Sequence, residues 1–215
     1  MGNMADCWRG RLTGVSILYW KRLPTLPAVA ADQKPGAKEQ PKSAAPPQMS
    51  EQEMMALYMK YATPGPEHEI LKSWAGNWKV VSKSWMSPGE PQVSEGTAVR
   101  SMLLGGRYLK DEYKSVFMDQ PFEGYGITGY DLYKKEFISI WLDTMGTGIM
   151  IARGKMDASG KVMTMTATFD DPASGEKKMI KEITKIVDAN KQIFEMWENR
   201  DGKDVKTMEL TYTRE

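Results

Sequence analysis

Residues 162–187 read "VMTMTATFDDPASGEKKMIKEITKIV" and show the pattern that decides the fold. From residue 163 onward, apolar side chains alternate with threonines, the apolar ones being Met163, Met165, Ala167 and Phe169. A period of two is typical of a β-strand with one buried face. The segment "DPASGEK" that follows is rich in turn-forming residues, and "MIKEITKIV" is again strand-like. The stretch therefore predicts two antiparallel strands joined by a short turn.

Eight further segments have the same character: "NWKVVSKSW", "SEGTAVRSML", "RYLKDEYKSVF", "YGITGYD", "FISIWLD", "GIMIARGKM", "QIFEMWEN" and "TMELTYTR". Turn sequences such as "SPGEPQ", "DASGK", "DANK" and "NRDGKD" separate them, and no long helical pattern intervenes. Ten consecutive antiparallel strands close most simply into an up-and-down barrel, because closure removes exposed sheet edges. The fold class predicted is therefore all-β, a ten-stranded antiparallel barrel over about residues 76–215.

Short helical signals precede the barrel. Ser50 followed by Glu53 forms a capping box, and apolar residues then recur at helical spacing, which predicts an amphipathic helix over residues 50–62. The segment "EHEILKSWAGNW" predicts one more helical turn with three inward side chains, Ile70, Leu71 and Trp74. The barrel domain is accordingly placed at residues 50–215.

Residues 1–49 differ from the rest and predict a disordered tail. Arg9 and Arg11, the apolar residues 12–20 and the small residues 28–30 are ingredients of an export signal, although Lys21 interrupts them. The apolar stretch is too short to span a bilayer, which needs about 20 residues. A polar linker rich in Pro and Ala follows. An exported or periplasmic location and a cytoplasmic one both remain open.

Composition excludes several function classes. Cys7 is the single cysteine and His68 the single histidine, so neither an intrachain disulfide nor a Cys/His metal site can form. The net charge of +1 divides into +4 for residues 1–50 and −3 for the remainder. An acidic body argues against nucleic-acid binding. No metal, cofactor or transmembrane segment is expected.

Several segments carry a family resemblance: "PGPEHEILKSWAGNW", "SEGTAVRSMLLGGRYL", "PFEGYGITGYD", "WLDTMGTG" and "MELTYTR". Together they resemble a bacterial domain-of-unknown-function family, fifteen-seventy-nine, over residues 52–215. The Gly76-x-Trp78 element resembles the start of calycin (lipocalin-like) barrels. The resemblance implies a calycin-like barrel and no activity. Nitrobindin-type barrels bind haem through a histidine, but His68 precedes the strands and is expected at the surface of the closing helix.

The resemblance also implies a structural contact. In calycin barrels an arginine from the barrel end lies across the Gly-x-Trp indole. Here Trp78 is on the first strand and Arg214 on the last, and those strands are neighbours in a closed barrel. A guanidinium on an indole face contributes roughly 0.5–2 kcal/mol. We therefore expect Gly76, Trp78 and Arg214 to close the barrel base.

Candidate lumen residues are mostly aromatic: Tyr108, Tyr130, Trp141, Asp143 and Trp197. The glycines of "GYGITGY" are interpreted as sites of barrel curvature or close backbone approach. Asp131 is expected to stabilise the turn that follows it. For Asp143, an inward carboxylate and a cap over the loop "TMGTG" are both open.

Three functions are compatible with the sequence. The first is a binding module whose lumen takes a small apolar or amphipathic ligand. The second is an enzyme with Asp143 or Glu195 as general base. The third is a partner-binding homodimer, because "FISIWLD" is apolar on both faces. No catalytic residue set can be assembled from the sequence.

Overall fold

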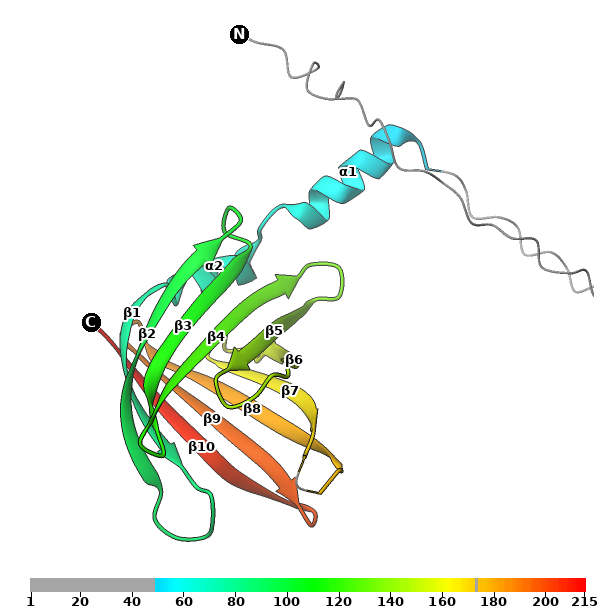
Figure 1. Cartoon of the computed structure of the whole chain (residues 1–215). Helices are drawn as coiled ribbons and strands as arrows, with labels where there is room; N and C mark the ends of the chain where they lie inside the picture. Colours follow the sequence, from blue (N-terminus) through cyan, green and yellow to red (C-terminus); the bar gives the residue numbers. More distant parts are fainter. Residues whose placement is uncertain (1–48, 173) are drawn as a thin grey trace, which may run out of the picture. The chain divides into compact units, whose positions relative to one another are not determined.

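A computed structural model describes residues 49–172 and 174–215 as a closed barrel of ten strands (Figure 1). The predictions for residues 1–48 concern a part of the chain outside the described residues. The strands are β1 (Gly76–Ser84), β2 (Gln92–Leu103), β3 (Tyr108–Phe117), β4 (Gln120–Asp131), β5 (Glu136–Asp143), β6 (Met150–Met156), β7 (Val162–Asp170), β8 (Lys177–Asp188), β9 (Lys191–Arg200) and β10 (Lys203–Arg214).

Every strand pairs antiparallel with its neighbours in the sequence, and β10 pairs with β1. The prediction of an up-and-down barrel is confirmed. Bulges interrupt the register of β9 with β10 between Lys206 and Met208, and of β8 with β9 between Ile186 and Asp188. Bulges of this kind bend strands and help a sheet to curve into a barrel.

Two helices precede the barrel, α1 (Glu51–Ala62) and α2 (Pro66–Ser73). The predicted capping box is present, since the Ser50 amide donates to the Glu53 carboxylate at 2.9 Å and the Glu53 amide to Ser50 Oγ at 3.3 Å. No residue of α1 is buried. Tyr61 meets Tyr133 of the β4–β5 turn edge-on, with ring centroids 5.4 Å apart. Neither helix that the structure describes is long and apolar enough to cross a membrane.

Helix α2 lies against one end of the barrel (Figure 1) and contacts β2, β3 and β4. Leu71 and Trp74 point inward as predicted, and Leu71 is fully buried. His68 is also buried, contrary to the surface position expected from the sequence. Its Nδ1 accepts the Gly65 amide at 3.0 Å, which caps the first turn, and this places the ring beside Tyr130.

The barrel closes where the last strand meets the first. The Arg214 guanidinium lies 4.2 Å from the Trp78 ring centroid. It also donates to three backbone carbonyls, those of Ala75 and Ser73 at 2.7 Å and that of Ala189 at 3.0 Å. Gly76 has φ +137°, and a Cβ there would stand 2.4 Å from Arg214 Nη1. A glycine is therefore needed next to the guanidinium, both for backbone conformation and for space.

We predict that Arg214→Ala lowers the free energy of unfolding by about 3 kcal/mol, because it removes the stacked guanidinium and three charge-assisted hydrogen bonds. Arg214→Lys should recover only part of this, since one ammonium cannot reach three carbonyls and stack on the indole. Urea unfolding followed by tryptophan fluorescence measures both. The control is Arg200→Ala on the surface, where a change within about 0.5 kcal/mol is expected. Equal effects at the two positions would contradict a closing role for Arg214.

Candidate ligand-binding cavity

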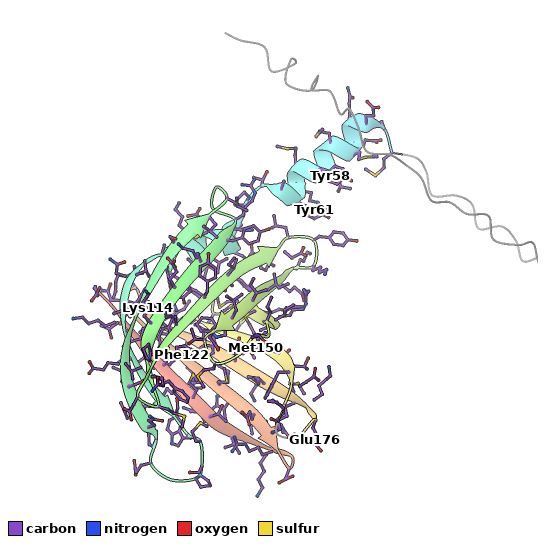
Figure 2. All side chains as sticks on the ribbon, in the orientation of Figure 1. Tyr58, Tyr61, Lys114, Phe122, Met150 and Glu176 are labelled. Atoms are coloured by element: carbon purple, nitrogen blue, oxygen red, sulfur yellow. The ribbon has the colours of Figure 1, made fainter. Side chains whose placement is uncertain are left out.

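The barrel encloses a cavity of about 910 Å³. Leu109 and Trp74 line it near the end covered by α2, and the loops after β5 and β7 line it at the other end. Phe122 of β4 and Met150 of β6 also line it (Figure 2). Lys114, by contrast, points away from the outer face of β3 (Figure 2). The volume lies within the range of small-molecule sites, roughly 300–1,000 Å³.

Apolar side chains dominate the lining, and methionine is prominent among them: Met145, Met150, Met163, Met165, Met196 and Met208. Methionine side chains are flexible and polarisable, so they adapt to ligands of different shape. Part of the unusual methionine content of this chain is thus concentrated around one cavity. Small polar side chains, such as Ser82, Ser115 and Thr184, also line the cavity, and their small size leaves its interior open between the larger side chains.

A buried polar cluster lies toward the closed end. Arg100 Nε donates to Asp111 at 2.8 Å, and its Nη1 donates to Gln192 at 2.9 Å. The guanidinium also lies 4.2 Å from the ring centroid of Tyr212 and 5.6 Å from that of Trp78. Burial raises the pKa of the Tyr212 hydroxyl well above its usual range. The positive charge of Arg100 is therefore already balanced by Asp111 and held between fixed partners.

Two buried polar atoms of the lining have no hydrogen-bond partner among the described residues. They are the indole nitrogen of Trp74, a donor, and Oδ1 of Asp111, an acceptor. An unpaired buried polar atom carries a desolvation penalty of about 1–3 kcal/mol. Neither atom has accessible surface, so both lie behind the cavity wall.

Trp141 and Asp143 line the cavity, as expected from the alternation in β5. The Trp141 indole donates to Asp143 Oδ2 at 2.8 Å, and the Met145 amide donates to Oδ1 at 2.9 Å. Asp143 therefore does both things considered for it, because it borders the lumen and caps the loop "TMGTG". Gly124 and Gly126 provide room for the indole, since a Cβ on Gly124 would approach Trp141 to 2.2 Å. Close approach of this ring explains the two glycines.

Tyr108 and Trp197 lie on the outer face of the barrel, unlike the lumen position expected from the sequence. On β3 the side chain of Leu109 points inward, so that of the preceding residue, Tyr108, points outward, where it lies against Gly129. On β9 the inward side chains are those of Phe194 and Met196. Trp197 is consequently directed outward, where Lys206 stands 5.3 Å from its ring centroid.

Tyr130 does point inward, but it packs at the closed end rather than along the cavity. Its ring centroid is 4.8 Å from that of Phe137 and 6.1 Å from that of His68. Asp131 beside it stabilises the predicted turn by accepting the amides of Tyr133 and Lys134 at 2.9 and 3.0 Å.

Glu195 is buried on the outer face of β9 beneath two lysines. It accepts hydrogen bonds from Lys206 at 2.8 Å, Lys185 at 2.9 Å and the Trp197 indole at 3.2 Å. Burial acts to raise the pKa of this carboxyl, but the hydrogen bonds from Lys206, Lys185 and Trp197 outweigh it and lower the pKa to about 2. A carboxylate so firmly ionised and so well paired is a weak general base.

Glu182 is the opposite case on the neighbouring strand. It lines the cavity and is 8% exposed, and no hydrogen bond or ion pair joins its carboxyl to any residue that the structure describes. Its cross-strand neighbours on the same face are Met165 of β7 and Met196 of β9. Burial raises the pKa of its carboxyl to about 7.

Arg100, Asp111, Glu182 and Gln192 were not recognised as lumen residues from the sequence. The signal was present, since Arg100 shares its strand face with Ala98, and Glu182 shares its face with Ile180. A charged residue in the inward phase of an otherwise buried strand is an informative exception. The described residues contain no cluster of three or more His, Cys, Asp or Glu side chains suited to a metal ion.

Comparison with known protein families assigns the chain to one of them. Residues 63–214 match the family described as "Protein of unknown function (DUF1579)", and the chain belongs to this family. The expected family membership is thereby confirmed. The comparison with curated proteins found no match.

Solved structures support the same fold. A barrel described as Rv2717c from M. tuberculosis superposes with a TM-score of 0.52 at 13% identity, covering 71% of this chain and 99% of the other. The S-type phycobiliprotein lyase CPES from Guillardia theta gives a TM-score of 0.52 at 10% identity, covering 69% and 92%. At these identities the likeness shows a common barrel architecture.

Glu182→Gln should change the pH dependence of stability. The folded-state pKa of about 7 lies above the ordinary value of 4.5. Wild-type stability gained from the protonated carboxyl is therefore complete below pH 4.5 and is lost as the pH rises through 7. The amide does not titrate, so the variant does not lose this stability. As the pH rises from 4.5 to above 7, the free energy of unfolding of the variant should increase by on the order of 3 kcal/mol relative to that of the wild type. Urea unfolding at about pH 4.5 and pH 8.5 measures the difference.

The matched control for that experiment is Glu95→Gln, which removes the same charge from an exposed position of β2. Its stability should follow the wild type at both pH values. A pH profile of Glu182→Gln that ran parallel to the wild type would show that Glu182 titrates normally.

Proposed function

We propose that the protein binds a small apolar or amphipathic molecule inside the barrel. The observation that carries the proposal is the cavity of about 910 Å³, lined mainly by methionine, other aliphatic and aromatic side chains, with polar groups between them. Apolar walls with a small number of placed polar groups are the usual composition of a ligand site. The Glu182 carboxyl lines the cavity without a partner among the described residues, so it can orient a polar head.

The alternative of an enzyme with Asp143 or Glu195 as general base has less support. Both oxygens of Asp143 already accept hydrogen bonds, and Glu195 faces away from the cavity with a lowered pKa. A solved barrel of similar fold is named as a phycobiliprotein lyase, so the architecture is compatible with an activity. No pair of groups in the present barrel favours a specific reaction over binding.

Binding can be tested with N-phenyl-1-naphthylamine, an apolar probe that is uncharged near neutral pH and fluoresces more strongly in apolar surroundings. We expect saturable binding of one probe per barrel. Thr184→Phe should weaken it about tenfold or more, because the new ring occupies lumen space at a position that lines the cavity. Thr164→Phe makes the same substitution on the exposed outer face of β7 and should bind like the wild type.

If the probe does not bind, or if both phenylalanine variants bind it as the wild type does, the cavity is not a ligand site. Circular dichroism of both variants establishes that each remains folded.

We also propose that the protein forms a homodimer through the outer face of β4, β5 and β6. Ile127, Ile140 and Ile151 are directly paired across these three strands and so form one apolar row. Ile151 is 49% exposed, and Leu142 beside the row is 36% exposed. Ile127 and Ile140 are half-buried, so the row is a partly exposed apolar surface of the kind that a partner can cover.

Light scattering should give the mass of a dimer for the wild type and that of a monomer for Ile151→Lys, because a lysine cannot be desolvated in an apolar interface without a partner. Thr166→Lys, on the exposed outer face of β7, serves as the control and should remain dimeric. A wild type that is monomeric at high concentration would refute this proposal.

A further inference from the structure

We infer that the cavity selects ligands bearing one protonated amine on an apolar body, and that the ammonium pairs with the Glu182 carboxylate. The inference rests on the proposed binding function and specifies the class of ligand. It is carried by the position of Glu182, a carboxyl that lines the cavity, is 8% exposed and has no partner in the described part of the chain.

The surroundings of Glu182 cannot supply the missing partner. Met165 and Met196 flank it across the strands, and a thioether is a weak acceptor that donates nothing. Along its own strand the inward neighbours are Ile180 and Thr184, and neither bonds the carboxyl. Charge and hydrogen-bond donation must therefore come from a molecule in the cavity, and an ammonium provides both.

The other charged side chains of the cavity lining are already paired or hydrogen-bonded to other residues. The ionisable side chains of the lining are those of Arg100, Asp111, Asp143, Asp170, Glu182, Tyr113 and Tyr212. Arg100 is balanced by Asp111 at 2.8 Å. Asp143 is bonded within the rim, and Asp170 stands 3.5 Å from Lys177. With those two pairs balanced, Asp143 and an ionised Glu182 leave two negative charges in the lining, which favours a cation over an anion.

The distance of Glu182 from the closed end of the barrel suits an amphipathic molecule. It pairs with Met196, whereas the closed-end cluster includes Gln192, four residues earlier on β9. That separation is roughly 13 Å along the strand. An ammonium bound to Glu182 would thus sit midway in the lumen, with apolar walls available to the rest of the molecule.

The pairing implies a pH dependence. Below pH 7 the Glu182 carboxyl is mostly protonated, so an ammonium must displace a proton before it can pair. Affinity for an alkylamine should therefore fall about tenfold per pH unit below that point and stay level up to the amine pKa, near 10.4. An alcohol of the same chain length should show no such dependence.

The experiment is competition against bound N-phenyl-1-naphthylamine by dodecylamine, dodecanol and dodecanoate, each below its micelle concentration or solubility limit, at about pH 5 and pH 8. For the wild type at pH 8 we expect dodecylamine to displace the probe at a concentration about tenfold or more below that of dodecanol, and dodecanoate to be weakest. Glu182→Gln should bring amine and alcohol within about threefold, while Glu95→Gln should retain the wild-type order.

The outcomes separate the two proposals. If the probe binds but the amine preference survives in Glu182→Gln, or dodecanoate competes best, or no competitor displaces the probe, the inference about Glu182 is overturned and the binding function stands. If the wild type does not bind the probe, the binding function itself fails and the inference falls with it.

Discussion

The contact between Arg214 and Trp78 joins the two ends of the sheet, and the rest of the structure depends on it. The same guanidinium donates to the carbonyl of Ser73, the last residue of α2, to that of Ala75 and to that of Ala189 in the β8–β9 turn. One side chain therefore links the closing helix, the first strand, the last strand and a turn. Because these four parts meet at one end, that end is sealed, and the barrel can hold a cavity that opens elsewhere.

The sealed end also sets the electrostatics of the lumen. The Trp78 ring centroid lies 4.2 Å from the Arg214 guanidinium and 5.6 Å from that of Arg100. One indole therefore contacts both the arginine that closes the barrel and the arginine of the internal polar cluster. Arg100 is desolvated and needs its fixed partners, Asp111 and Gln192, to remain charged without a large penalty. The closed end is thus polar, but its charges balance each other. The uncompensated carboxyl is that of Glu182, farther along the barrel wall.

The strands and their antiparallel order could be predicted because each leaves a regular signal, whereas the closing arginine was implied by the resemblance to calycin barrels. Alternation in "VMTMTATF" assigns a face without any knowledge of neighbours, and a last strand must pair with the first once the sheet closes. The lumen residues were harder to predict. A shift of one position separates Tyr108, which is outside, from Leu109, which is inside, and only the packing on both sides of β3 decides the phase. His68 was expected at the surface because nothing in its sequence neighbourhood reports how closely α2 packs on the barrel end.

Glu182 and Glu195 lie on adjacent strands and both are buried, yet they face opposite sides of the wall. Glu195 has two lysines and an indole around it, so its charge is compensated and contributes to holding β8, β9 and β10 together. Glu182 has methionines on either side, so its charge weakens the fold above neutral pH with no compensating contact. A glutamine or a methionine would pack at this position without that penalty. A side chain that destabilises the empty barrel and points into its cavity is explained most directly by an interaction that exists only when the cavity is filled.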